Sequence, residues 1–265
     1  MKKTKILMYV LAMVLTLSLA ACGSKQNAES ESTGASGGDS QKEYLVGTDA
    51  SYAPFESMTA DNQFVGFDME IVQAIADKGG FKIKLINTPW EGIFATLNSG
   101  DRDIIISAVT ITEERLKEYD FSDPYFDAKQ SIAVPKTSSV QKFDDLKDKV
   151  VGVQTGTTGD EVVTKLLGAD SGNIKRLETT PLALKELENG GVDAVVADNG
   201  VVNNYVKNNS DKGFKTVDDA SFAKESYGLV TKKGNKELLD KINAGLKAIK
   251  EDGTYDTIYQ KYFGE

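Results

Sequence analysis

Short apolar segments alternate with amphipathic segments from residue 44 to the C-terminus. The short segments predict strands at 44–48, 81–86, 103–107, 131–134, 150–153, 174–177, 192–197 and 227–231. Apolar residues at helical spacing, such as Ile71, Val72 and Ile75, predict helices at 68–78, 90–98, 158–167, 181–188, 199–207, 236–250 and 255–262. Strands that alternate with helices are typical of α/β folds, in which helices flank mixed, mostly parallel sheets.

A short pattern occurs twice and divides this α/β region. Superposing Asp103 on Asp193 aligns three further pairs: Gly100 with Gly190, Leu97 with Leu187, and Phe94 with Leu184. Each copy reads as a helix, a glycine stop and an apolar strand that begins after an Asp. The repeat favours two small domains over one large one, although two ordinary helix-turn-strand units would give the same pattern.

The N-terminus has the composition of a secretory signal. Three lysines precede an apolar run at 6–19, which is shorter than the about 20 residues of a membrane span. The run ends in Leu-Ala-Ala-Cys, which matches the lipobox of bacterial lipoproteins, so we predict a signal peptide at 1–21 and lipidation of Cys22. The alternative is an ordinary signal peptide with a stray cysteine. Residues 23–43 have no large apolar side chain and predict a disordered tether after Cys22.

Charge and residue usage exclude several classes of function. The net charge is −9, and removal of residues 1–21 deletes three lysines and no acids, which takes it to −12. Nucleic acid is therefore not an expected partner. Histidine is absent, which excludes a Ser-His-Asp triad and a His-ligated metal. Cys22 is the only cysteine, so no disulfide forms within the chain, and we expect neither a metal nor a cofactor.

Candidate binding residues follow two of the predicted strands. Ser107, Thr110 and Arg115 come after the strand at 103–107, and Asp198 comes after the strand at 192–197. Open α/β sheets bind ligands outside the carboxyl ends of their strands. The planar guanidinium of Arg115 matches a carboxylate, and the two hydroxyls can share the same anion. The alternatives are a solvated Arg115 beside two glutamates and a helix-capping role for Asp198.

Four motifs in order resemble the family 3 periplasmic-type solute-binding proteins, which supply polar amino acids to ABC importers. These motifs are GTDASYAPF at 47–55, SAVTITEER at 107–115, FSDPY at 121–125 and VGVQTGTT at 151–158. The resemblance covers 44–263 and implies a two-lobe periplasmic-binding-protein-like fold of type II, with the ligand in the interlobe cleft. It implies a lobe 1 of 44–134 plus 226–265, a lobe 2 of 138–224, and crossovers near 135–138 and 223–226.

The resemblance also implies roles for individual residues. Tyr52 would stack on the ligand, Asp49 would lie toward the ligand's side chain, and Trp90 would form a pocket wall able to hold a cation. For all three, the alternative is an ordinary core or turn residue. Arg115 would bind the α-carboxylate and Asp198 the α-ammonium. The other expected contributors are Ser107, Ala108, Thr110, Gln154, Thr157 and Thr158, with Ala108 limited to backbone contacts.

The function implied is capture of an L-amino acid by lobe closure and its delivery to the transmembrane subunits of an ABC permease. The protein would be a monomer, lipid-anchored on the extracytoplasmic face of the cell membrane at the cell surface or in a periplasm, and would catalyse no reaction. Arginine, lysine or histidine is the leading ligand class, and glutamine or another polar amino acid is the alternative. A cyclohexadienyl or arogenate dehydratase on the same fold, and a sensor lipoprotein that contacts another protein, remain further alternatives.

Overall fold

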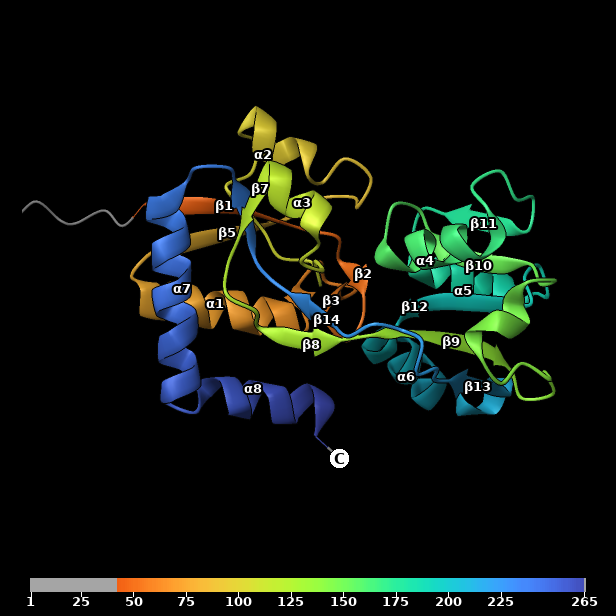
Figure 1. The fold of residues 1–265 in the computed structure, drawn as a ribbon. Helices are drawn as coiled ribbons and strands as arrows, with labels where there is room; N and C mark the ends of the chain where they lie inside the picture. Colours follow the sequence, from red (N-terminus) through yellow and green to blue (C-terminus); the bar gives the residue numbers. More distant parts are fainter. Residues whose placement is uncertain (1–41, 265) are drawn as a thin grey trace, which may run out of the picture. The chain divides into compact units, whose positions relative to one another are not determined.

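The computed structural model describes residues 42–264 (Figure 1). The predicted signal peptide, Cys22 and most of the predicted tether lie outside these residues. Within the described part of the chain, no helix is long and apolar enough to cross a membrane. Two five-stranded sheets organise this part, as an α/β fold requires.

The first sheet contains the N-terminal strand and a strand from near the C-terminus. Its order is β5-β1-β6-β15-β7, with β1, β5 and β6 parallel and β15 antiparallel to both of its neighbours. The bounds are β1 (Glu43–Thr48), β5 (Lys82–Asn87), β6 (Ile104–Ile105), β7 (Tyr119–Phe121) and β15 (Val230–Lys232). The chain therefore returns to its first sheet after completing the second.

The second sheet has the same plan. Its order is β11-β10-β12-β9-β13, with β10, β11 and β12 parallel and β9 antiparallel to both of its neighbours. The bounds are β9 (Gln130–Pro135), β10 (Val151–Gln154), β11 (Ile174–Leu177), β12 (Ala194–Asp198) and β13 (Phe214–Val217). In both sheets the first strand of the parallel trio lies between the second and the third.

The repeated sequence pattern has the same structure in both sheets. The Asp103 N–H donates to the Leu45 carbonyl at 2.8 Å, and an Asp103 carboxylate oxygen accepts from the Leu45 N–H at 2.8 Å. Asp193 makes the same two contacts with Val150, at 2.7 and 2.8 Å. Each aspartate thus aligns the third parallel strand with the first. The repeated sequence pattern therefore has the same local structure in both sheets.

Two short antiparallel strands connect the sheets. They are β8 (Phe126–Ala128) and β14 (Glu225–Tyr227). β8 leads directly into β9, which pairs with β12 and β13 of the second sheet. The predicted lobe 1 boundary at 134 is therefore too late, because the chain enters the second sheet near Lys129 and not at 135–138. The predicted strand 227–231 is divided between β14 and β15.

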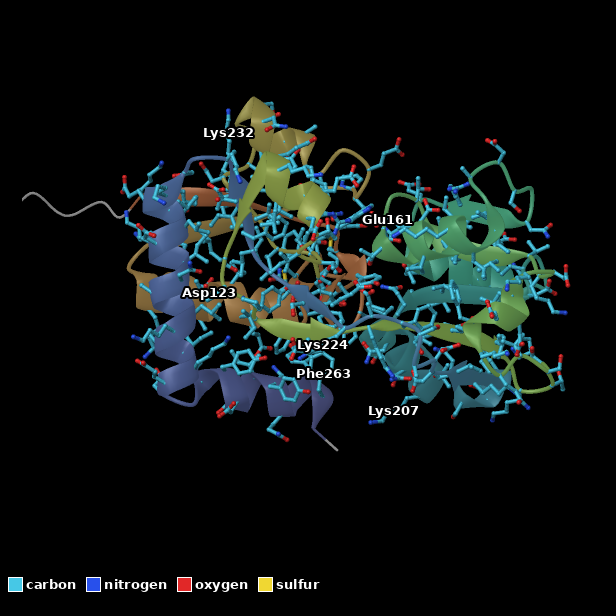
Figure 2. The ribbon with its side chains drawn as sticks, viewed as in Figure 1. Asp123, Glu161, Lys207, Lys224, Lys232 and Phe263 are labelled. Carbon is cyan, nitrogen blue, oxygen red and sulfur yellow. The ribbon has the colours of Figure 1, made fainter. Side chains whose placement is uncertain are left out.

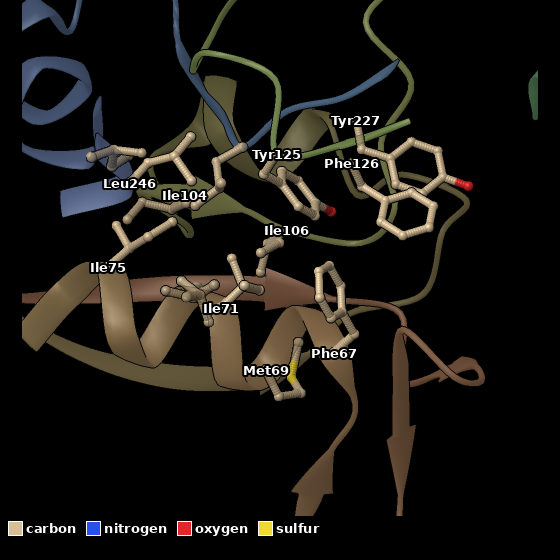
Figure 3. Packing of buried hydrophobic residues seen from close by; sticks show 14 of the residues in the cluster. Phe67, Met69, Ile71, Ile75, Ile104, Ile106, Tyr125, Phe126, Tyr227 and Leu246 are labelled. Atoms are coloured by element: carbon tan, nitrogen blue, oxygen red, sulfur yellow. The ribbon is translucent and has the colours of Figure 1, made fainter. Parts of the chain in front are cut away.

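Helices cover both sheets and enclose the apolar cores. α1 (Phe67–Gly79) and α7 (Lys236–Glu251) pack together, and a Cβ at Gly245 would lie 2.3 Å from the Ile75 carbonyl oxygen, so only glycine allows this approach. Figure 3 shows this core, in which Phe67 and Ile71 of α1 face Ile104 and Tyr125. α8 is Thr254–Phe263. The second sheet is flanked by α4 (Thr158–Leu167), α5 (Thr180–Glu188) and α6 (Asn199–Asn208).

Shorter elements complete the description. They are β2 (Ser51–Tyr52), β3 (Glu56–Met58), β4 (Phe64–Val65), α2 (Ala95–Ser99), α3 (Glu113–Glu118), η1 (Phe143–Leu146) and η2 (Ser210–Lys212). The helix predicted at 90–98 begins only at Ala95, because Gly92 has φ 87°, a left-handed conformation that interrupts a helix. Charged side chains such as Lys207, Lys224 and Lys232 extend from the surface (Figure 2).

Candidate functional site

A cavity lies at the carboxyl ends of strands from both sheets. It is lined by Asp49, Tyr52, Glu56, Trp90, Ser107, Ala108, Thr110, Arg115, Gln154, Thr157, Thr158 and Asp198. Every predicted ligand-binding residue is in this set, because each one ends or follows a strand whose carboxyl end lies at the cavity. Glu56 is the one lining residue that was not predicted.

Arg115 is held at the cavity by its own short helix and by two aromatic rings. Thr112 caps α3, with its hydroxyl accepting from the Arg115 N–H at 3.2 Å. One guanidinium nitrogen donates to the Thr110 carbonyl at 2.9 Å, and another donates to the Gly156 carbonyl at 3.5 Å. Burial lowers the pKa of Arg115, but an arginine remains a cation. The fork therefore has further N–H donors for a ligand.

Trp90 contacts the guanidinium group of Arg115. The Arg115 guanidinium lies 5.4 Å from the Trp90 ring centre and 5.3 Å from that of Phe94. The indole N–H also donates to the Gly156 carbonyl at 3.4 Å. Among the described residues, Arg115 therefore lies at cation–π distance from Trp90. Trp90 lines the cavity as predicted and in addition orients Arg115.

Asp198 supplies a buried carboxylate opposite this cation. It precedes α6, but its side chain makes no capping hydrogen bond, which argues against the helix-cap alternative. The Tyr227 hydroxyl donates to one carboxylate oxygen at 2.5 Å, and the Gln130 amide donates to the other at 2.5 Å. Burial, followed by repulsion from Glu225, raises the pKa of Asp198 to about 6. A ligand cation at this position would favour the ionised form.

The hydroxyl groups of the site do not point their hydrogens at the cavity. Ser107 donates to Glu56 at 2.8 Å, while Thr110 and Thr158 donate to Glu225 at 2.7 and 2.9 Å. The prediction that Ser107 and Thr110 share a ligand anion is not supported in this conformation, because a hydroxyl has only one hydrogen to donate. These oxygens can still act as acceptors.

Glu56 and Asp68 form a buried acid pair behind the site. The pKa of Glu56 is raised by burial and by the Asp68 charge, and burial raises the pKa of Asp68 to about 6. One oxygen of each carboxyl group has no partner among the described residues. A single proton held between the two carboxyl groups would satisfy both oxygens. Asp68 also accepts from the Ala108 N–H at 2.8 Å, which fixes Ala108 in a left-handed conformation with φ 46°.

Asp49 and Gln154 form a second polar end of the cavity. The Gln154 amide nitrogen donates to Asp49 at 3.2 Å, and the amide oxygen accepts from Thr180 at 2.9 Å. Ser51 also donates to Asp49, at 2.9 Å. Burial raises the pKa of Asp49, since these partners are neutral and do not offset the cost of desolvating its charge. This carboxylate has remaining acceptor positions for a cationic or amide group.

The start of α4 adds backbone donors. Thr157 caps the helix, and its hydroxyl accepts from the Asp160 N–H at 3.2 Å. The Thr158 N–H, in the first turn, has no acceptor among the described residues. Such N–H groups favour anions, so Thr158 can contribute its backbone to a carboxylate. The Tyr52 hydroxyl accepts from the Asp198 N–H at 3.4 Å, which joins the two sides of the cavity.

Glu56, Gln130, Glu225 and Tyr227 contribute to the site but were not predicted. Glu225 lies within the predicted crossover 223–226. That position between the lobes was the only sequence feature that could have indicated a role in the site. Gln130 immediately precedes the predicted strand 131–134, and Tyr227 begins the predicted strand 227–231. Neither residue belongs to a distinctive motif. Among residues 42–264, no group of three or more His, Cys, Asp or Glu side chains is arranged to hold a metal ion.

The family model for bacterial extracellular solute-binding proteins, family 3, matches residues 44–265. The chain belongs to this family. The match covers both sheets, both connecting strands and every residue that lines the cavity.

Individual members of the family agree with this assignment. A protein named "Probable histidine-binding protein" from Neisseria gonorrhoeae is 46% identical over 250 residues, covering 94% of this chain and 92% of its own length. The arginine-, lysine-, histidine-binding protein ArtJ from Geobacillus stearothermophilus is 47% identical with a TM-score of 0.81, covering 84% of this chain and 96% of its own. An ancestral arginine-binding protein bound to glutamine is 46% identical with a TM-score of 0.79, covering 84% and 98%.

Proposed function

We propose that this solute-binding protein captures an L-amino acid between its two sheets and delivers it to an ABC permease. The observation that carries the proposal is the placement of one cation and one buried anion at the same cavity. Arg115 matches the α-carboxylate, and Asp198 matches the α-ammonium. The N–H of Thr158 supplements Arg115. Because Arg115 and Asp198 belong to elements of different sheets, the zwitterion stabilises the closed arrangement.

The charges of the cavity support a basic side chain. Arg115 and Asp198 are matched by the two main-chain charges of the ligand, and Glu56 shares a proton with Asp68. Asp49 then remains as a carboxylate with neutral partners. A guanidinium, ammonium or imidazolium group at Asp49 would balance its charge. We therefore propose arginine, lysine or histidine as the ligand, which agrees with the ligands named for the Neisseria and Geobacillus proteins.

Glutamine is the second candidate. The Gln154 amide and the Asp49 carboxylate together offer a donor and an acceptor to a ligand amide. The ancestral arginine-binding protein with bound glutamine supports this alternative. The dehydratase alternative requires a ring substrate to be consumed at the same cavity.

The proposed cellular setting follows from the family and the N-terminal sequence. Members of the family are extracellular, and the lipobox supports attachment to the cell membrane through acyl chains on Cys22. We propose that the protein acts as a monomer at the extracytoplasmic face. Replacement Cys22→Ser should release the protein from the membrane fraction, and retention of the variant there would refute the lipid anchor.

Calorimetric titration of a chain beginning at residue 23, refolded to remove bound ligand, tests the proposal. The common L-amino acids, prephenate and arogenate are each titrated. Saturable binding of Arg, Lys or His with one site supports the basic receptor, and binding of Gln alone reassigns the specificity. Conversion of prephenate or arogenate to a product would establish the dehydratase activity. Failure of every amino acid to bind refutes the transport function.

A further inference from the structure

Glu225 contacts the site from outside the ligand cavity. It does not line the cavity, but it lines a separate surface groove together with Thr110 and Thr158. Its carboxylate accepts from the Thr110 hydroxyl at 2.7 Å, from the Thr158 hydroxyl at 2.9 Å and from the Gln130 amide at 3.0 Å. The two threonines therefore lie between Glu225 and the cavity.

The hydrogen-bonding roles in this cluster are determined by chemistry. An ionised carboxylate only accepts, so both threonine hydroxyls must donate their single hydrogen to Glu225. The same rule orients Gln130, whose NH2 group faces the carboxylates of Asp198 and Glu225. Both threonine oxygens then have only lone pairs for other partners, and one lone pair of Thr158 already accepts from the Gln130 amide at 3.1 Å. Lone pairs suit an ammonium group and oppose a carboxylate.

The backbone fixes Glu225 beside Thr110. The Ile111 N–H donates to the Ser226 carbonyl at 2.8 Å, and the Gly228 N–H donates to the Val109 carbonyl at 3.1 Å. These bonds hold the connecting strand β14 against the segment that carries Thr110. Thr158 and Gln130 belong to elements of the second sheet, so the cluster is complete only when both sheets meet the connecting strand.

We propose that Glu225 is a positioning residue that makes Thr110 and Thr158 acceptors for the α-ammonium group of the ligand. The ammonium group then lies among two hydroxyl oxygens and the Asp198 carboxylate. The α-carboxylate is left to Arg115 and to backbone N–H groups. This inference rests on the proposed amino-acid binding function and deepens it, because it assigns the polarity of two side chains through a residue that does not touch the ligand.

Glu225→Gln tests the inference, because the amide retains the size of the side chain but can donate to the threonine oxygens. The affinities for L-arginine and for 5-guanidinopentanoate, which lacks only the α-amino group, are measured by titration. Binding is followed by the fluorescence of the single tryptophan, Trp90. The variant should raise the Kd for L-arginine about tenfold, as expected for one mispaired hydrogen bond. It should leave the Kd for 5-guanidinopentanoate within about twofold of the wild-type value. Asp127→Asn removes a charge from the paired strand β8 at an exposed position and should change neither affinity.

Other results would overturn the inference. Equal weakening of both ligands would show that Glu225 supports the carboxylate site or the fold. Tighter binding of both by Glu225→Gln would show that Glu225 competes with the ligand carboxylate.

If the analogue binds too weakly to measure, Thr110→Val and the double variant decide the question with L-arginine alone. Glu225→Gln should add less than about twofold to Thr110→Val, whereas independent additive losses would refute the coupling. Failure of the wild-type protein to bind any amino acid refutes the proposed function and leaves these comparisons without a ligand. If glutamine is the ligand, L-glutamine and glutaramate replace the arginine pair.

Discussion

Lowering the pH should weaken amino-acid binding through Asp198. The pKa of this buried carboxyl group is about 6 in the ligand-free protein, because burial and then Glu225 disfavour its charge. A ligand ammonium requires the ionised form. Affinity is therefore fully present above about pH 7 and is lost as the pH falls through about 6. The ionised fraction is about nine-tenths at pH 7 and about one-tenth at pH 5, so the Kd for L-arginine should rise about tenfold.

Calorimetry provides a second measure of the same event. At about pH 6 the group is half protonated, so binding should release about half a proton, detected by titration in buffers of different ionisation enthalpy. Asp68→Asn is the matched control, because Asp68 also has a pKa of about 6 but does not line the cavity. This variant should retain the tenfold change. A Kd that is flat between about pH 7 and about pH 5 would refute the assignment of the ammonium to Asp198.

Three further variants test the specificity, the core and the acid pair. Asp49→Asn should weaken the binding of L-arginine about tenfold or more and the binding of L-glutamine by less than about threefold, as measured by calorimetry. Equal losses of affinity for the two ligands would contradict the side-chain assignment. Gly245→Ala should lower the free energy of unfolding by about 1–3 kcal/mol in denaturant titrations, because its Cβ would meet the Ile75 carbonyl; unchanged stability would show that α1 and α7 separate easily. In the wild type, the raised pKa of Glu56 makes folding take up a proton, so this contribution is present at low pH and is lost as the pH rises. Stability of Glu56→Gln relative to wild type should therefore increase between about pH 5 and about pH 8, and a constant difference would argue against the shared proton.

Much of the fold follows from hydrophobic periodicity. The helix at 158–167 and the strand at 174–177 have the predicted bounds, because a full amphipathic face or a flanked apolar run specifies each one locally. The strands β2, β3 and β4 were not predicted, because segments of two or three residues have no periodicity. The strand predicted at 131–134 is present as β9, but its membership of the second sheet was not predicted, since strand pairing in a mixed sheet depends on contacts far along the chain.

The positions of the site residues were predictable, but their hydrogen-bond partners were not. Ser107 and Thr110 follow a buried strand, and this fact alone directs them to the cavity. Their acceptors, Glu56 and Glu225, are 51 and 115 residues away in the sequence. Nothing in the local pattern indicates these partners, yet they determine whether each hydroxyl donates or accepts. Trp90 illustrates the same limit, because its cation partner is supplied by the protein.

The central claim is that Arg115 recognises the carboxylate of an amino acid in this cavity. Its most direct test is titration of L-arginine into wild type, Arg115→Ala and the matched control Arg102→Ala. Arg102 donates to Thr88 at 3.1 Å and does not line the cavity. We predict saturable binding by wild type and by Arg102→Ala, and a loss of about a hundredfold or more in Arg115→Ala, as for a charged hydrogen-bonded pair that loses one partner. Equal binding by all three proteins would contradict the account.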